Sequence, residues 1–265
     1  MRLQNKVIIV TGSTTGIGKA IAFCCVEEGA RVVIHGLEKD WGEKVVAEIG
    51  KDKAALHIED LTNDGAVQRL VDAAIKNFGK IDGVVNNAAW VVSSNIETTD
   101  AAFLHKVLDV NSVVPFLLIK TALPHLQETH GSVLNIGSVN AYCGEPNLFA
   151  YSVSKGALMT MTRNLGDTLF RENGVRVNQI NPGWVLTETE IKRKHEQGLP
   201  EDWYKNISDV YAPSGRILLP AEIAVAAIYW ISDESSSISG QVVEIEQHPF
   251  IGRNPPKDPS TIYKK

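Results

Sequence analysis

The stretch that decides the fold is Val7-Ile8-Ile9-Val10-Thr11-Gly12-Ser13-Thr14-Thr15-Gly16-Ile17-Gly18. Its first four residues form a short apolar run, as expected of a strand buried on both faces. The glycines that follow suit a nucleotide-binding turn: Gly12 allows a sharp bend, Gly16 lets a pyrophosphate approach the backbone, and Gly18 lets helix and strand pack closely. The phosphates would then sit at the positive end of the next helix. The stretch therefore predicts a strand, a phosphate-binding turn and a helix.

The rest of the chain continues this alternation. Strands are expected at Lys6–Val10, Arg31–His35, Ala54–Ile58, Gly83–Asn86, Gly131–Ile136, Arg176–Ile180 and Gln241–Glu246. Helices are expected at Gly18–Glu28, Lys39–Ile49, Asp64–Phe78, Thr99–Val110, Val114–Glu128, Ser152–Arg171 and Ala221–Ile231. Strands that alternate with helices indicate a parallel sheet covered on both faces. We therefore expect a single α/β domain with a doubly wound, Rossmann-like, mostly parallel sheet.

Composition limits the function classes. The chain has 265 residues, 44% of them hydrophobic, and a formal net charge of −5. These values are ordinary for a globular protein and exclude a disordered, collagen-like or coiled-coil chain. With no overall basic field, we expect neither a nucleic acid nor a membrane as partner.

The location and the metal content are also predicted from simple patterns. The sequence has no run of about 18 apolar residues and no secretory signal at its start, so we expect a soluble, cytoplasmic protein. Cys24, Cys25 and Cys143 fit neither a disulfide framework nor a metal-ligand spacing. We therefore expect no metal site.

The chemistry is predicted to lie in Tyr151-Ser152-Val153-Ser154-Lys155. Tyr151 and Lys155 are four residues apart, so they share one face of a helix. A free tyrosine has a pKa of about 10, and a neighbouring ammonium group lowers that pKa toward the range of a useful base. Ser138, at the end of the fifth expected strand, has a hydroxyl suited to holding the substrate oxygen beside the phenol.

Together these features resemble the short-chain dehydrogenase/reductase family, in its single-domain branch. The resemblance runs from about Asn5 to Glu246. The residues that carry it are Thr11–Gly18, Asp60, Asn86–Ala88, Asn111, Ser138, Tyr151, Lys155 and Pro182-Gly183. It implies a seven-stranded doubly wound sheet, and a homotetramer or homodimer built through the helices near 99–128 and 151–171.

The resemblance also implies roles for individual residues. Tyr151 is the general acid/base, and Ser138 polarises the reacting oxygen. Lys155 binds the nicotinamide ribose and lowers the pKa of Tyr151, and Asn111 holds a water that relays protons. The implied cofactor-binding set is Gly12, Thr14, Thr15, Gly16, Ile17, Gly18, Leu37, Asp60, Leu61, Asn87, Ala88, Ala89, Tyr151, Lys155, Pro182, Gly183, Val185 and Thr187.

Cofactor choice departs from the family pattern. NAD-using relatives usually have an acid at the place of Gly36, and NADP-using relatives often have an arginine at the place of Leu37. This chain has neither. Burying a 2′-phosphate without a cation is costly. We therefore favour NAD, although Lys39 keeps NADP open.

Substrate specificity is expected to come from a lid at about residues 187–214, within a catalytic domain at 1–248. The family's glycine pair near the end of the last strand is replaced by Gln247-His248, and a tail follows at 249–265. We expect this tail to close the pocket or to pack on a neighbouring subunit. The predicted substrate residues are Trp90, Asn140, Glu145, Asn147, Trp184 and Glu188.

The favoured function is an NAD(P)-dependent dehydrogenase/reductase acting on CH–OH donors. Polar groups beside flat aromatic faces favour a sugar or polyol over a steroid or a fatty acyl chain. The alternative is a 3-ketoacyl thioester reductase. A third interpretation is a non-catalytic cofactor-binding module.

Overall fold

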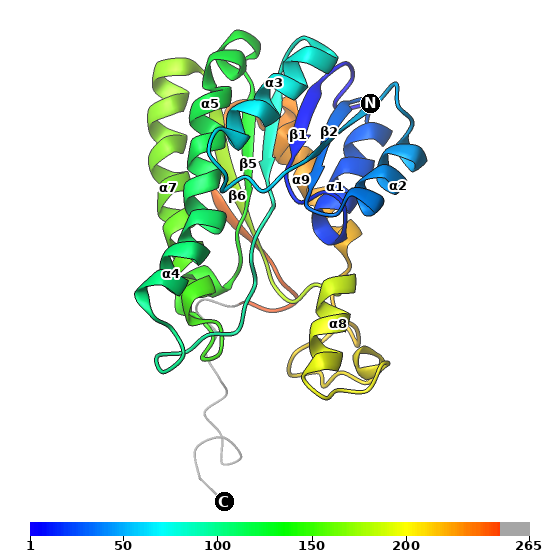
Figure 1. The fold of residues 1–265 in the computed structure, drawn as a ribbon, viewed down its shortest axis with the longest axis vertical. Coiled ribbons are helices and arrows are strands. Elements are labelled where there is room, and N and C mark those ends of the chain that lie inside the picture. The colour runs from blue at the N-terminus through cyan, green and yellow to red at the C-terminus, as the bar shows by residue number, and fades with distance from the viewer. Residues whose placement is uncertain (250–265) are drawn as a thin grey trace, which may run out of the picture.

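The computed structural model describes residues 1–249, which are built around one seven-stranded sheet (Figure 1). Neighbouring strands all run parallel, in the order β3-β2-β1-β4-β5-β6-β7. The strands are β1 Val7–Val10, β2 Arg31–Gly36, β3 Ala54–Ile58, β4 Gly83–Asn86, β5 Ser132–Ile136, β6 Arg176–Pro182 and β7 Val242–Ile245. This order confirms the expected doubly wound fold. It reverses direction at β1, which pairs with both β2 and β4, so ligands are expected at the carboxyl ends of these strands.

Alternate residues of β1 explain why its sequence is apolar throughout. Ile8 and Val10 belong to the hydrophobic core on one face of the sheet, and Ile9 belongs to the core on the other. All three side chains are fully buried. Successive side chains of a strand point to opposite faces, so a strand covered on both faces must be apolar at every position.

Helices form the two outer layers. The helices α1, α2 and α9 supply the core on one face, and α3, α5 and α7 supply the core on the other (Figure 1). The helices are α1 Gly16–Glu27, α2 Lys39–Ile49, α3 Ala66–Phe78, α4 Ala101–Leu108, α5 Val114–Thr129, α6 Asn140–Cys143, α7 Phe149–Asn173, α8 Glu188–Glu196 and α9 Pro220–Ile231. Most bounds lie within three residues of those expected, and the short helices α6 and α8 lie outside the expected helix ranges.

The connection between α4 and α5 differs from the expectation. The sequence predicts two helices separated near Val110, but a π-helical turn at Asp109–Val113 joins α4 to α5 without a break. Such wide turns occur as single insertions within helices and are frequent at functional sites. The turn contains Asn111.

The joined segment Ala101–Thr129 is long and apolar enough to span a membrane by length and composition, which the sequence pattern of two separate helices did not indicate. One side of α5 is buried in the core through residues such as Leu118, Ile119 and Leu126. That side of α5 is therefore apolar because it packs in the hydrophobic core, as in any helix that covers a sheet.

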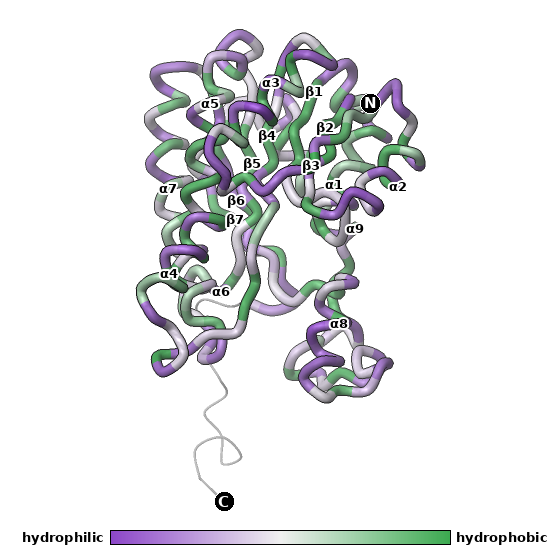
Figure 2. The backbone as a smooth tube through the Cα atoms, viewed as in Figure 1, coloured by the Kyte–Doolittle hydropathy of each residue, from purple (hydrophilic) through white to green (hydrophobic). Residues whose placement is uncertain are grey.

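The lid forms a separate lobe below the carboxyl ends of the strands. It contains α8 and a short 3-10 turn at Trp203–Lys205 (Figure 1). Its chain is largely hydrophilic, whereas the strands of the sheet are largely hydrophobic (Figure 2). Gln247 ties the end of the lid to the end of β7: its side chain accepts a hydrogen bond from Ser214 N at 3.0 Å and donates one to Arg216 O at 2.7 Å. Of the expected tail, all but Pro249 lies outside the described residues.

Candidate active site

The glycine turn after β1 has the geometry that a nucleotide site requires. Gly12 and Gly16 have φ angles of +61° and +54°, a region that favours glycine. A Cβ at Gly12 would lie 2.8 Å from Ala88 Cα, and one at Gly18 would lie 2.3 Å from Gly12 O. Gly18 therefore serves the packing of the turn, and Gly12 lets β1 and the segment after β4 approach closely.

His35 holds this turn in place and was missed by sequence reasoning. Its Nδ1 accepts a hydrogen bond from Gly12 N at 3.2 Å, and its Nε2 lies 2.9 Å from Glu59 O. These partners require a neutral ring with the proton on Nε2. Burial lowers the pKa of His35 to about 4, which keeps the ring neutral. A histidine at the end of a buried strand beside a glycine turn was the available clue.

The other side of the turn is held by the segment after β4. Thr11 Oγ1 accepts hydrogen bonds from Asn87 N and Ala88 N, both at 3.0 Å. The Asn87 side-chain amide donates to Thr11 O and Gly12 O, both at 2.9 Å. Asn87 and Ala88 are therefore held against the glycine turn and form part of the wall of the nucleotide site.

The end of β2 explains the missing acid at position 36. A Cβ at Gly36 would lie 2.4 Å from Thr14 Cγ2 and 2.7 Å from Thr14 Oγ1. Thr14 is buried, so its side chain has little room to move away. Leu37 and Glu38 line the large cavity that begins at the glycine turn. Lys39, in contrast, pairs with Glu43 on the exposed face of α2, at 3.6 Å.

Tyr151 and Lys155 lie in the first turns of α7, and Ser138 lies just after β5. All three are buried and line the same cavity. Ser138 Oγ accepts a hydrogen bond from Asn140 N at 3.2 Å, which leaves its own proton free to donate. Lys155 Nζ donates to Ile136 O at 2.7 Å and lies 5.7 Å from the centre of the Tyr151 ring. The structure thus brings together the three side chains expected to do the chemistry.

The electrostatics of this group differ from the expectation in one respect. Burial raises the pKa of Tyr151 to about 12, although hydrogen bonding with Ser138 and the charge of Arg193 act in the opposite direction. Burial also lowers the pKa of Lys155 to about 7. Desolvation is the largest influence on the pKa of both groups, because both side chains are buried.

Asn111 is fully buried in the π-helical turn. Its Oδ1 accepts a hydrogen bond from Trp90 N at 2.7 Å, and its Nδ2 donates to Ser154 Oγ at 3.0 Å. Asn111 thereby ties the segment after β4 to α7, beside Lys155. The proton relay expected of Asn111 stays a prediction.

One large cavity of about 1270 Å³ joins the glycine turn to the catalytic group. Of the predicted cofactor residues, all except Gly18 line it. Asp60 lines the cavity and accepts hydrogen bonds from the backbone and side chain of Thr62, which lower its pKa. A cavity with glycine-lined walls and a helix N-terminus fits a dinucleotide.

The predicted substrate residues divide into two groups. Trp90, Asn140, Glu145 and Trp184 line the cavity, but Asn147 and Glu188 are not among its lining residues. Asn147 O accepts a hydrogen bond from Ser94 N at 2.9 Å. Glu188 turns toward the glycine turn, where its carboxylate accepts a hydrogen bond from Gly16 N at 3.2 Å. The direction in which the start of α8 faces depends on how the lid packs and cannot be predicted from local sequence patterns.

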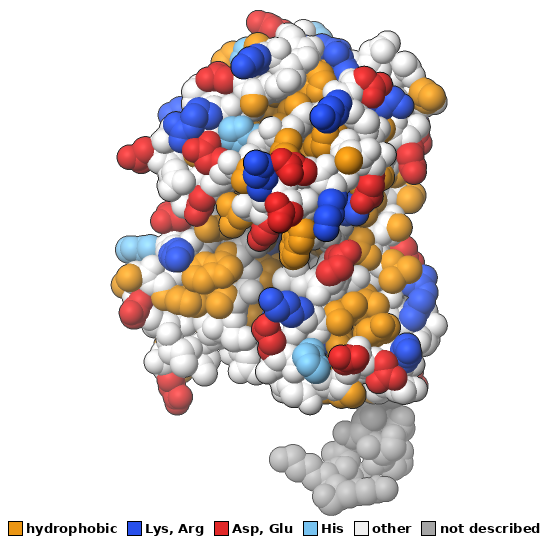
Figure 3. All heavy atoms as spheres, turned by 45° about the vertical axis from the view of Figure 1, so that its right-hand side comes forward, with side chains coloured by type: hydrophobic (Ala, Val, Ile, Leu, Met, Phe, Trp, Pro, Cys, Tyr) orange, Lys and Arg blue, Asp and Glu red, His pale blue; other side chains and the backbone are white. Residues whose placement is uncertain are grey.

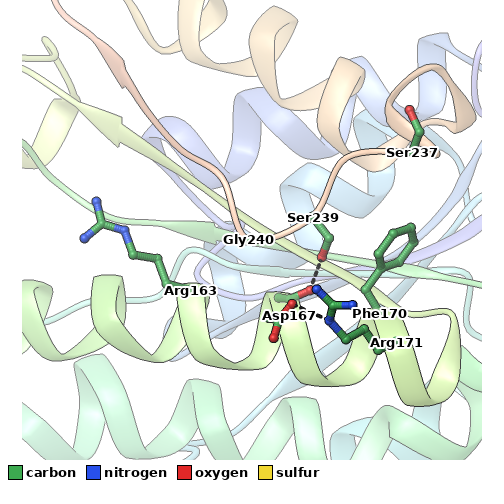
Figure 4. A pocket seen from close by; sticks show the side chains of 8 residues that line it. Arg163, Asp167, Phe170, Arg171, Ser237, Ser239 and Gly240 are labelled. Atoms are coloured by element: carbon green, nitrogen blue, oxygen red, sulfur yellow. Dashed lines mark hydrogen bonds and ion pairs between the residues drawn. The ribbon is translucent and has the colours of Figure 1, made fainter.

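A second hollow lies outside this site, between α7 and the loop before β7 (Figure 4). Several of its polar groups bond within the protein: Arg171 pairs with Asp167 at 2.7 Å, and Ser239 donates to Gly166 O at 2.7 Å. Acidic and basic side chains are interspersed on the face shown in Figure 3. Within residues 1–249 no group of three or more His, Cys, Asp or Glu side chains could hold a metal ion.

Known proteins resemble this chain over nearly its full length. A family model described as enoyl-(acyl carrier protein) reductase matches residues 12–247. The NADP-dependent (R)-specific alcohol dehydrogenase of Lentilactobacillus kefiri is 34% identical, over 90% of this chain and 94% of that protein. L-fucose dehydrogenase of Mus musculus is 34% identical, over 88% and 84%. Glucose 1-dehydrogenase 2 of Bacillus subtilis is 33% identical, over 92% and 94%. With this similarity and a buried Ser-Tyr-Lys group beside a dinucleotide cavity, the chain belongs to the short-chain dehydrogenase/reductase family and is an NAD(P)-dependent oxidoreductase acting on CH–OH donors.

Proposed function

We propose that this enzyme interconverts a secondary alcohol and a ketone on a sugar or polyol, with NAD as the preferred cofactor. The observation that carries the proposal is the lining of the cavity around Tyr151. Asn140 and Glu145 offer polar groups from one wall, and Trp90 and Trp184 offer flat aromatic faces. Carbohydrate hydroxyls match such a mixture better than an acyl chain does. Two of the similar proteins are named fucose and glucose dehydrogenases.

The side chains support the following division of work. The Tyr151 phenol oxygen takes the hydroxyl proton during oxidation and returns it during reduction, while the Ser138 hydroxyl donates to the reacting oxygen. Lys155 keeps two N–H donors beyond its bond to Ile136 O, and these suit a ribose diol. The nicotinamide ring, when bound, supplies the hydride acceptor or donor. A protonated Lys155 and a cationic ring both lower the pKa of Tyr151 from its buried value.

The preference for NAD rests on the charges near Leu37. Glu38 lines the cavity there, and the nearby Lys39 is already paired on α2. A 2′-phosphate would bring negative charge toward Glu38 without a dedicated cation. One similar protein is named as NADP-dependent, so the comparison of the two cofactors is a direct test.

We also propose a cytoplasmic homodimer or homotetramer. Phe116 and Leu117 of α5 and Phe149 and Val153 of α7 leave 38–41% of their surfaces exposed. Apolar side chains that gather on adjacent helices favour association between subunits.

The testing experiment is a substrate panel of sugars, polyols, simple secondary alcohols and ketoacyl thioesters, each assayed with both cofactors. We expect the highest kcat/KM with a sugar or polyol and NAD. A higher kcat/KM with NADP would contradict the cofactor preference. A thioester as best substrate would replace the sugar assignment with ketoacyl reduction.

A further inference from the structure

The helix α8 of the lid brings two cationic side chains to the substrate end of the cavity. Arg193 and Lys194 are consecutive, both are half-buried, and both line the cavity together with Tyr151. By contrast, Lys192 on the same helix has a side chain that is 78% exposed. The two inward-facing cations are therefore distinct from the solvated face of α8.

Arg193 is held in a fixed position by a buried network. Its Nε donates to Glu190 Oε2 at 2.9 Å, its Nη2 lies 2.7 Å from the same oxygen, and Trp184 Nε1 donates to Glu190 Oε1 at 2.9 Å. The Glu190 side chain is only 11% exposed. A guanidinium group has five N–H donors, and Glu190 faces only one edge of it. The remaining donors are available to a planar anion such as a carboxylate.

Lys194 completes the arrangement from the other side of Trp184. Its Nζ lies 5.6 Å from the centre of the Trp184 ring, which stacks on Trp203 with centroids 5.3 Å apart. Within the described residues 1–249, Lys194 takes part in no ion pair. The aromatic face positions the ammonium group without neutralising it.

The acidic side chains nearby are mostly engaged with the protein itself. Glu246 accepts hydrogen bonds from Trp184 N at 3.0 Å and from Gln247 N at 2.7 Å. Glu145, after β5, has only Asn140 Nδ2 near its carboxylate, at 3.5 Å. The phenol of Tyr151 feels the charges of both Arg193 and Glu145, which act on its pKa in opposite directions. Both charges therefore lie close to the reacting atoms, one from the lid and one from the loop after β5.

We propose that Arg193 and Lys194 bind an anionic group of the substrate, so that the preferred substrate is a polyhydroxy acid rather than a neutral sugar or polyol. Its carboxylate would lie against the two lid cations, and its hydroxyls would face Glu145 and Asn140. This proposal rests on the proposed sugar or polyol chemistry of the same site.

The test compares pairs of substrates that differ by one carboxylate. Glucitol is paired with gluconate, galactitol with galactonate, and 2-butanol with 3-hydroxybutyrate, each assayed with NAD and with NADP. We expect the acid of a reactive pair to have about 10- to 100-fold higher kcat/KM, mostly through KM, with an advantage that falls as salt rises. A higher kcat/KM for the neutral member of every reactive pair would overturn the proposal.

The lid variants then locate the effect. K194M leaves the Glu190 network intact and should abolish most of the preference for the acid, while the neutral member of the pair changes less than about twofold. R193M should also lower the preference for the acid, and it is judged by the ratio of kcat/KM for acid and neutral member alone, because it leaves Glu190 without its ion-pair partner and removes a charge near Tyr151. R193K should restore part of the preference. K192M, which changes an exposed cation on the same helix, is the control and should behave as wild type. Equal losses for both members of a pair would mean that these cations only stabilise the lid, and would reject the proposal.

The pair of 2-butanol and 3-hydroxybutyrate distinguishes the proposed anion subsite from the proposed sugar or polyol substrate. If 3-hydroxybutyrate is preferred over 2-butanol while every polyol and aldonate is inert, the anion subsite stands and the sugar assignment fails. If no pair reacts, calorimetry with the Tyr151→Phe protein loaded with NADH decides: tighter binding of gluconate than of glucitol supports the subsite, and equal or undetectable binding of both overturns it.

Discussion

The nucleotide half of the cavity and the lid half are built in different ways. Around the glycine turn, His35, Thr11 and Asn87 form partly buried hydrogen bonds that fix each wall to a strand of the sheet. The lid, in contrast, is a hydrophilic lobe outside the sheet, and exposed contacts tie it to the glycine turn and to β7. The comparison shows how one chain combines a fixed cofactor site with an adaptable substrate site.

The largest effect is expected in the fixed half, at Tyr151. Tyr151→Phe removes the group that exchanges the hydroxyl proton and should lower kcat by about 10³-fold, because general acid–base catalysis contributes on that order. Cofactor affinity, measured by nicotinamide fluorescence titration, should stay nearly unchanged. Tyr229→Phe, which removes a phenol hydroxyl on α9 outside the lining of the cavity, is the matched control. A Tyr151→Phe enzyme within tenfold of wild type would reject the assignment.

A smaller effect is expected from His35, as a dependence of stability on pH. Its folded pKa of about 4 lies below the ordinary value of 6.5, so below pH 6.5 the unfolded chain takes up a proton that the folded chain refuses. The stability that neutral His35 contributes is therefore present above pH 6.5 and is lost as pH falls toward 4, by about 3 kcal/mol in all.

Urea denaturation from pH 7 to pH 4 measures this loss. The gap in unfolding free energy between wild type and His35→Asn should narrow as the pH falls. His195→Asn, at an exposed position on the lid helix, is the control and should keep a constant gap. A constant gap for His35→Asn as well would show that the ring is not held neutral in the folded protein.

The smallest effect is expected in the lid. Gln247→Ala removes both side-chain hydrogen bonds that join Gln247 to residues 214–216. The lid should then be less ordered, and the substrate KM should rise about two- to fivefold with little change in kcat. Gln197→Ala, at the exposed end of α8, should leave KM unchanged. Equal KM values for wild type and Gln247→Ala would mean that the Gln247 hydrogen bonds do not order the substrate pocket. The difference between the nucleotide half and the lid half of the cavity would then be smaller than described.

The same contrast explains what the sequence could predict. The glycine turn, Ser138, Tyr151 and Lys155 lie within short motifs whose spacing reflects one strand end or one helical face, so local patterns suffice. The sheet follows from apolar runs such as that of β1. These features are enough to predict the fold class and to propose the catalytic group.

The rest depends on contacts between distant segments. The hydrogen bond between His35 and Gly12 joins residues 23 positions apart, and the hydrogen bonds of Gln247 join residues more than 30 positions apart. Such pairs leave no periodic pattern in the sequence. The π-helical turn at Asn111 widens a helix by local geometry, and the direction in which Glu188 and Arg193 face depends on how the lid packs. The pKa of Tyr151 also depends on its burial in the assembled cavity, which local spacing does not indicate.

The packing of Thr14 against Gly36 has a consequence for how cofactor choice can change over time. An acidic side chain at position 36 would collide with Thr14, so a substitution there alone would damage the turn before it could grip a ribose. A smaller residue at position 14 would have to come first or arrive together with it. A position in the glycine turn and a position at the end of β2 are thus coupled, and a lineage carrying this pair keeps its present solution until both change.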